Sequence, residues 1–138
     1  MSRDLKPAAV IFAAGKGSRM KGHNGNKTLL PLVSRGSTYH GERPMLLHIL
    51  DQLPPGPKAV VVHHQKDDVL RATEHLGLTH CHQPVMNGTG GALLAARPFL
   101  KSLTADRVII TMGDVPLVRR RTYESLLDRL QDHSLVVL

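Results

Sequence analysis

The sequence predicts an α/β domain, with a doubly wound, mainly parallel sheet of about five strands and helices on both faces. Short apolar runs without strict alternation recur along the chain and are typical of strands buried on both faces. Segments with helical spacing of apolar residues lie between these runs, and this alternation favours right-handed crossovers within one sheet. At 138 residues the chain is long enough for one such domain with its own core.

The candidate strands of this Rossmann-like sheet are rich in β-branched residues and leucine. They occupy residues 8–13, 58–63, 78–82, 107–112 and 134–138. The last run stands at the end of the chain without a turn, a helix or a polar tail behind it. Because a chain seldom ends in the middle of a sheet, we expect residues 1–138 to be part of a longer domain that is truncated at the C-terminus.

The candidate helices are segments in which apolar residues recur every three or four positions. They occupy residues 45–53, 67–76, 89–99 and 122–130. Pro54-Pro55-Gly56 ends the first helix, Gly77 suits the C-cap of the second, and Pro98 falls late in the third or at its end. The predicted order is therefore β-α-β-α-β-α-β-α-β.

A long polar stretch, residues 15–43, interrupts this order after the first strand. Loops of that length inside a compact domain are usually functional or disordered. Open α/β sheets bind ligands beyond the carboxyl ends of their strands, and residues 15–27, 83–91 and 113–121 all follow such ends. We therefore expect three polar segments to converge on one edge of the sheet.

The composition narrows the class of partner. Eighteen basic against 11 acidic residues give a net charge of +7, which favours polyanions such as nucleotides, sugar phosphates or nucleic acid. Aromatic residues make up only 3% of the chain, so the stacking platforms of single-stranded nucleic-acid binders are absent and no nucleic acid is expected. The single cysteine, Cys81, excludes an internal disulfide and suits a reducing compartment.

Membrane insertion and secretion are not expected either. The apolar run 8–14 is too short to cross a bilayer. Lys16 and Arg19 follow it where a signal peptide would have its small-residue cleavage site. We expect a cytoplasmic protein.

The first strand runs into Gly15-Lys-Gly-Ser-Arg-Met20, which has the character of a phosphate-binding loop. A dinucleotide loop needs a third glycine where Met20 stands, and an acid where the next strand ends in His63-His64. A Walker-type loop needs a Gly-Lys-Ser/Thr sequence preceded by an earlier glycine, which this stretch lacks. Neither of these loops fits.

The loop and two later motifs resemble the sugar-phosphate nucleotidyltransferases. The first motif is Ala13-Ala-Gly-Lys-Gly-Ser-Arg-Met20 followed by Asn26-Lys-Thr-Leu-Leu-Pro31. Gln83-Pro-Val-Met-Asn-Gly-Thr-Gly-Gly-Ala92 resembles the family's base-binding turn, and Gly113-Asp-Val-Pro-Leu117 its metal-binding turn. The match is closest to the uridylyltransferase domain of bifunctional enzymes that act on N-acetylglucosamine 1-phosphate. It implies the nucleotide-diphospho-sugar transferase fold, of which residues 1–138 would be the nucleotide-binding part.

The resemblance also implies roles for particular residues. Arg19 would hold the departing β- and γ-phosphates, Lys27 would reach the α-phosphate, and Asp114 would hold Mg²⁺. Gln83 and Gly88 would bind the pyrimidine edge, and Thr89 would begin the helix behind it. The implied nucleotide-binding set is Ala13, Ala14, Gly15, Lys16, Gly17, Ser18, Arg19, Gln83, Gly88 and Thr89.

Two positions depart from the family pattern. Asn26 stands where the family usually has proline, and Gly91 stands where the closest relatives have histidine. The implied reaction transfers a nucleoside monophosphate from a nucleoside triphosphate to a sugar 1-phosphate and releases pyrophosphate. UTP is the favoured triphosphate. The alternatives are a nucleotide-binding or interaction module without turnover, and a cytidylyl or guanylyl transferase for another phosphorylated acceptor.

The nine histidines raise the separate hypothesis of a metal site. Adjacent residues of a strand point to opposite faces, so His63 and His64 do not suit one ion. His80 and His82 share a face but lack a second pair at suitable spacing, which favours packing or surface roles. An oligomer is compatible with the sequence.

Overall fold

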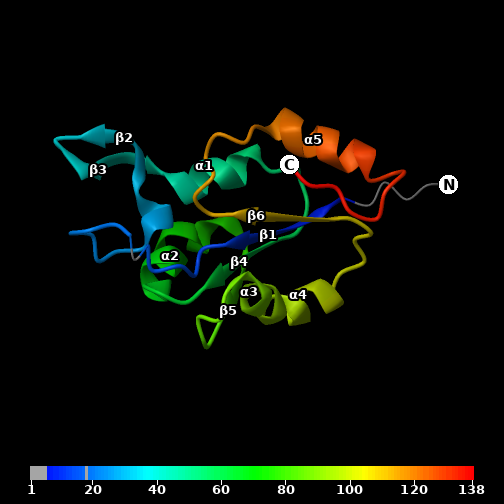
Figure 1. The fold of residues 1–138 in the computed structure, drawn as a ribbon, viewed down its shortest axis with the longest axis horizontal. Helices are drawn as coiled ribbons and strands as arrows, with labels where there is room; N and C mark the ends of the chain where they lie inside the picture. The colour runs from blue at the N-terminus through cyan, green and yellow to red at the C-terminus, as the bar shows by residue number, and fades with distance from the viewer. Residues whose placement is uncertain (1–5, 18) are drawn as a thin grey trace.

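The computed structural model of the protein describes residues 6–17 and 19–138. Its main sheet has four parallel strands in the order β5-β4-β1-β6 (Figure 1). They are β1 (Ala8–Phe12), β4 (Lys58–Val62), β5 (Thr79–His82) and β6 (Val108–Met112). The four strands agree with four of the predicted runs, and the predicted α/β fold class is confirmed.

Helices cover both faces of this sheet. One face packs against α1 (Met45–Gln52), α2 (Lys66–Thr73) and α5 (Arg120–Arg129), which contribute Leu46, Val69 and Tyr123 to its core. The other face packs against α3 (Thr89–Ala95) and α4 (Arg97–Lys101), with Ala92, Ala96 and Phe99 at its centre. In Figure 1, α1 and α5 lie above the strands and α3 and α4 below them. Within the described chain, no helix is long and apolar enough to cross a membrane.

The helix boundaries differ from the prediction in two places. The segment 89–99 forms two helices, because α3 ends at Ala95 and Pro98 falls in the first turn of α4, where its missing N–H costs nothing. The segment 67–76 ends in a 3₁₀ turn, Glu74–Leu76, after α2. Gly77 follows with φ of 64°, as expected for a glycine that ends a helix.

The long polar stretch is not simply a loop. It contains a short 3₁₀ turn, Lys27–Leu29, and an antiparallel hairpin of β2 (Pro31–Arg35) and β3 (Ser37–Pro44). The hairpin extends away from the main sheet, at the left of Figure 1. Its strands are mostly polar and exposed, so the apolar patterns that predict buried strands do not detect them.

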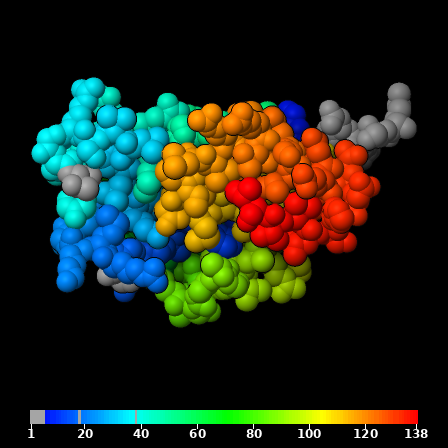
Figure 2. Space-filling view, turned by 45° about the horizontal axis from the view of Figure 1, so that its top comes forward, coloured from blue at the N-terminus to red at the C-terminus, as the bar shows by residue number. Residues whose placement is uncertain are grey.

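The predicted fifth strand, residues 134–138, is wrong. These residues form no ladder, and Leu135, Val137 and Leu138 are each 78% exposed. Figure 2 shows the end of the chain, in red, on the surface beside α5, in orange. Val136, Val137 and Leu138 line a hollow there together with Arg121, Leu126 and Arg129. A strand needs a hydrogen-bonding partner as well as an apolar sequence, and here the run does not pair with β6.

The edge strand β6 also departs from the prediction of burial on both faces. Its Ile109 and Thr111 face the core on the side of α5, where Thr111 Oγ1 lies 3.2 Å from the hydroxyl of Tyr123. Val108, Ile110 and Met112 point to the opposite face and are more than a third exposed. Of these three, Met112 borders the pocket described next.

Candidate functional site

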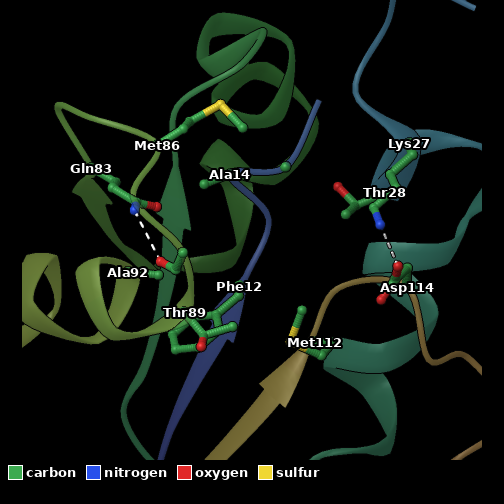
Figure 3. Close-up of a pocket in the computed structure, with 12 residues that line it drawn as sticks. Phe12, Ala14, Lys27, Thr28, Gln83, Met86, Thr89, Ala92, Met112 and Asp114 are labelled. Atoms are coloured by element: carbon green, nitrogen blue, oxygen red, sulfur yellow. Dashed lines mark hydrogen bonds and ion pairs between the residues drawn. The ribbon is translucent and has the colours of Figure 1, made fainter. Parts of the chain in front are cut away.

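The carboxyl edge of the sheet carries a pocket built from all three polar segments (Figure 3). Parallel pairing sets Phe12 of β1 beside Val61 of β4 and Met112 of β6, so the loops that follow these strands begin at one level. The pocket is lined by Phe12, Ala14, Gly15, Lys27, Thr28, Gln83, Met86, Gly88, Thr89, Ala92, Met112 and Asp114. The predicted convergence of the three segments is therefore confirmed.

An ion pair between Lys27 and Asp114 forms one side of the pocket. The lysine Nζ lies 2.5 Å from Asp114 Oδ2, although the two residues are 87 positions apart in the chain. Both side chains are about 30% exposed, so the pair stays accessible from the pocket. Asp114 follows β6 directly after Gly113, whose N–H donates to the carbonyl of Phe12 at 2.9 Å. The sheet thus brings the two charges together.

Asn26, which sequence analysis treated only as a departure, positions Lys27. It is 2% exposed, and its Nδ2 donates to the carbonyls of Ala13 at 2.7 Å and His64 at 2.9 Å. Its Oδ1 accepts from the backbone N–H and the hydroxyl of Thr28, at 3.0 and 2.7 Å. One side chain therefore ties the lysine turn to the ends of β1 and β4. The proline that the family usually has at this position could not make these side-chain hydrogen bonds. The presence of asparagine in its place was therefore the one sequence feature that could have indicated this role for Asn26.

The two glycines of the loop border the lysine side chain. Gly17 has φ of 61°, and a Cβ there would lie 3.3 Å from the Cβ of Lys27. A Cβ at Gly15 would meet the Lys27 Cε at 3.7 Å, an ordinary contact. The left-handed backbone together with the close lysine explains why glycine stands at position 17.

The other residues of the predicted nucleotide-binding loop do not all line the first pocket. Lys16, Gly17 and Arg19 line a second hollow, which shares Gly15, Lys27 and Asp114 with the first pocket. Ala13 is fully buried in the core and contributes only its backbone carbonyl, which Asn26 holds. Ser18, also in the predicted set, lies outside the described residues.

The hairpin of β2 and β3 contacts the same loop. The hydroxyl of Tyr39 donates to the carbonyl of Lys21 at 2.9 Å. The Tyr39 ring stacks on His23, with 5.0 Å between ring centroids and 17° between planes. These contacts connect the loop that carries Arg19 to a second element besides the sheet.

The opposite side of the pocket is neutral and centres on Gln83. This side chain is 4% exposed, and its Nε2 donates to Asn87 Oδ1 at 3.0 Å and to the Gly88 carbonyl at 3.2 Å. Gly88 has φ of 91°, a conformation that favours glycine, and Thr89 begins α3 directly after it. Asn87 was missed by sequence analysis, because an asparagine in a glycine-rich turn is ordinary turn chemistry.

The histidines form no metal centre within the described ranges, which hold no group of three or more His, Cys, Asp or Glu side chains arranged for an ion. His80 Nε2 lies 2.7 Å from the Thr73 hydroxyl, and burial lowers the pKa of His80. His63 and His82 stack on each other with centroids 6.0 Å apart. Burial raises the pKa of the Cys81 thiol, so it is a poor nucleophile.

Comparison with known proteins finds a family match and close relatives. Residues 9–138 match the MobA-like NTP transferase domain. The chain is 37% identical over 131 residues to "Bifunctional protein GlmU" of Francisella tularensis subsp. novicida, covering 95% of this chain and 27% of that protein. The protein of the same name from Sphingopyxis alaskensis is 38% identical over 126 residues, covering 89% and 26%. The chain thus spans about a quarter of the length of these relatives.

Two solved structures share the fold. A nucleotidyl transferase from Methanothermobacter thermautotroptrophicus superposes with a TM-score of 0.66 at 24% identity, over 93% of this chain and 57% of that one. A CMP:2-keto-3-deoxy-manno-octonic acid synthetase complexed with CTP gives a TM-score of 0.63 at 21% identity, over 94% and 49%. At these identities the two structures support the fold alone, which is that of nucleotide-diphospho-sugar transferases.

Proposed function

The chain belongs to the MobA-like NTP transferase domain family, and we propose that it is the nucleotide-binding part of a sugar-phosphate nucleotidyltransferase. The proposed reaction transfers a nucleoside monophosphate from a nucleoside triphosphate to a sugar 1-phosphate and releases pyrophosphate. UTP, which would transfer UMP, is the favoured triphosphate. The resemblance of the three motifs to the sugar-phosphate nucleotidyltransferases makes a sugar phosphate the favoured acceptor. We place the protein in the cytoplasm, where its nucleotide substrate is available.

One observation carries this proposal: a neutral hydrogen-bonding side and a charged side share a single pocket. Gln83 and Gly88 offer amide and backbone groups suited to the edge of a base. Lys27, with Gly15 beside it, offers an ammonium and open backbone suited to phosphate oxygens. Figure 3 shows Gln83 and Lys27 on opposite sides of the opening, as a base and a phosphate of one nucleotide would require.

The residues suggest how the chain would act on the reactants. An oxygen of the sugar phosphate attacks the α-phosphorus, the bond to the β-phosphate oxygen breaks, and pyrophosphate leaves. Both reactants are anions, so Lys27 would neutralise charge that builds on the α-phosphate. Arg19 and Lys16, in the adjoining hollow, would hold the departing phosphates. Backbone N–H groups of the Gly15–Gly17 turn would add donors for phosphate oxygens. A side chain at position 17 would crowd Lys27.

The residues also fit a divalent metal such as Mg²⁺. Asp114 is an accessible carboxylate that already faces a cation, the Lys27 ammonium, at 2.5 Å. Mg²⁺ in phosphoryl-transfer sites is commonly held by one or two carboxylates together with substrate phosphates, so a larger cluster of side chains is not needed. When bound, the ion would neutralise phosphate charge and lower the barrier to displacement.

The direct test combines binding and turnover. Calorimetry with UTP, CTP, GTP and ATP, with and without Mg²⁺, measures which nucleotide the chain prefers. Pyrophosphate release with UTP and N-acetylglucosamine 1-phosphate measures transfer. We expect UTP to bind most tightly and Mg²⁺ to tighten it. We also expect Asp114→Ala to abolish release.

Other results would redirect the proposal. UTP binding without turnover would favour a nucleotide-binding module, the main alternative. A preference for CTP or GTP would favour transfer to another phosphorylated acceptor. Full activity of the Asp114→Ala variant would remove the metal role from Asp114, and failure to bind any nucleoside triphosphate would overturn the proposal as a whole.

A further inference from the structure

The orientation of the Gln83 amide is fixed by two acceptors on the same side. Its nitrogen carries two protons, and these go to Asn87 Oδ1 at 3.0 Å and to the Gly88 carbonyl at 3.2 Å. The Gly88 carbonyl can only accept, so turning the amide over would bring two acceptor oxygens together there. Figure 3 shows the nitrogen turned toward the Gly88–α3 turn and the oxygen turned toward Ala14. Gln83 therefore presents a hydrogen-bond acceptor, and not a donor, to the pocket.

Gly91 leaves the space that Asn87 occupies. A Cβ built at Gly91 would lie 1.6 Å from Asn87 Oδ1, 2.5 Å from its Cγ and 2.9 Å from its Nδ2. These are the three nearest heavy atoms, and all belong to Asn87. Gly91 lies within α3 with an ordinary helical backbone, so nothing in its own conformation requires glycine. Asn87 and Gly91 form a matched pair, in which the missing side chain of one admits the amide of the other.

We propose that Asn87 is a positioning residue that sets base specificity by holding the Gln83 acceptor toward the base, and that Gly91 makes this possible. The inference rests on the proposed function, because it assigns the base to the Gln83 side of the pocket. The proposal places this acceptor against N3 of a pyrimidine. Uracil donates its N3–H there, whereas cytosine presents a lone pair at N3 and carries its donor on the 4-amino group, so the fixed amide favours uracil over cytosine.

Four variants test the pair by calorimetry with UTP and CTP, each with Mg²⁺. In Asn87→Ala the Gln83 nitrogen keeps only the Gly88 carbonyl as an acceptor, so the amide is held less firmly, and we expect the preference for UTP over CTP to fall about tenfold, the equivalent of one hydrogen bond. Gly91→Ala displaces Asn87 and is expected to produce the same loss. The double variant Asn87→Ala/Gly91→Ala is expected to match Asn87→Ala alone, because no Asn87 side chain remains to be displaced. Asn87→Asp keeps an acceptor for the Gln83 nitrogen and is expected to retain the preference.

The matched control is Gly90→Ala. Gly90 is the neighbouring glycine of α3, and a Cβ there would meet nothing within 4 Å. This variant makes the same chemical change in the same helix turn, so we expect wild-type selectivity from it. Thermal melting of all the variants checks that each one is folded.

The outcomes separate this inference from the proposed function. A wild-type chain that binds no nucleotide overturns both. A wild-type chain that binds UTP and CTP equally, or an Asn87→Ala variant with unchanged preference, overturns only the role of Asn87. A Gly91→Ala loss that adds to the Asn87→Ala loss in the double variant overturns the pairing of the two positions.

Discussion

The two sides of the pocket are held in different ways. On the Gln83 side, the residues that matter lie within nine positions of one another and are linked by neutral hydrogen bonds. On the Lys27 side, an ion pair joins residues 87 positions apart, and Asn26 reaches the ends of two strands. The first side is a local turn, whereas the second exists only when the sheet has formed.

This difference implies that the two sides fail differently. A change on the Gln83 side is expected to alter which base is preferred while leaving the fold and the phosphate contacts in place. A change on the Lys27 side is expected to alter turnover, phosphate affinity or stability without changing the ratio of UTP to CTP binding. Variants of the Lys27 side therefore test whether the two functions are separable.

The largest effect is expected from the ion pair itself. Lys27→Gln removes the ammonium proposed to neutralise the α-phosphate, and Asp114→Asn removes the carboxylate proposed to hold Mg²⁺. We expect each change to slow pyrophosphate release by about 10²–10³-fold. The double variant is expected to lose less than the product of the two, because each single change leaves the other charge without its partner. Steady-state kinetics of the four proteins measures this.

A control for these charge changes is available on the hairpin. Arg35 pairs with Glu42 at 3.1 Å, and both side chains are more than half exposed. Arg35→Gln is expected to leave turnover unchanged, because exposed pairs contribute little and this one is remote from the pocket. Equal slowing by Arg35→Gln would mean that overall charge, and not the Lys27–Asp114 geometry, governs the rate.

The next effect is on stability, through Asn26. Asn26→Ala leaves buried backbone groups of Ala13 and Thr28 without their partner, and we expect the free energy of unfolding to fall by about 3 kcal/mol. Urea denaturation measures the loss. Asn24→Ala is the control. Asn24 is exposed, and its contacts with the side chains of His64 and Gln65 are made by its backbone carbonyl, which the substitution keeps. A similar loss in both variants would contradict the special role of Asn26.

The smallest effect is expected at the loop glycines. Gly17→Ala and Gly22→Ala both place a side chain on left-handed backbone, at a cost on the order of 1 kcal/mol in stability. Only the Cβ at Gly17 also approaches Lys27, whereas a Cβ at Gly22 meets nothing within 4 Å. We expect UTP affinity to fall about tenfold more in Gly17→Ala, the equivalent of one displaced phosphate contact. Equal affinities by calorimetry would remove Gly17 from the phosphate side.

Sequence analysis predicted the two central strands well because they are buried. Burial imposes continuous apolar runs, and the runs that became β1 and β4 carry that pattern, whereas the edge strands β5 and β6 were found although they are partly exposed. The same pattern at 134–138 produced a wrong strand, and the exposed hairpin of β2 and β3 was missed for the converse reason. An apolar pattern indicates that a segment tends to be buried, but it does not show whether the segment pairs with another strand.

The candidate site was predicted in part. The glycine loop, Lys27, Gln83, Gly88 and Asp114 were selected from the motifs, and the structure brings all of them to one edge of the sheet. Asn26 and Asn87 were not selected, although both hold a predicted residue in place. The sequence around a loop asparagine does not indicate which groups its side chain will bind. Here these groups are backbone carbonyls, a backbone N–H and a side-chain amide, and their positions depend on the fold.

By itself, the sequence determined that the central strands β1 and β4 are buried, where the glycine turns fall and which side chains were expected to carry the chemistry. These properties depend on residue type and on spacing over a few positions. The tertiary structure decided that Lys27 meets Asp114, that Asn26 joins the ends of β1 and β4, and that the last apolar run lies beside α5. Each depends on how the strands are ordered in the sheet, because only that order brings distant residues within reach of a hydrogen bond or an ion pair.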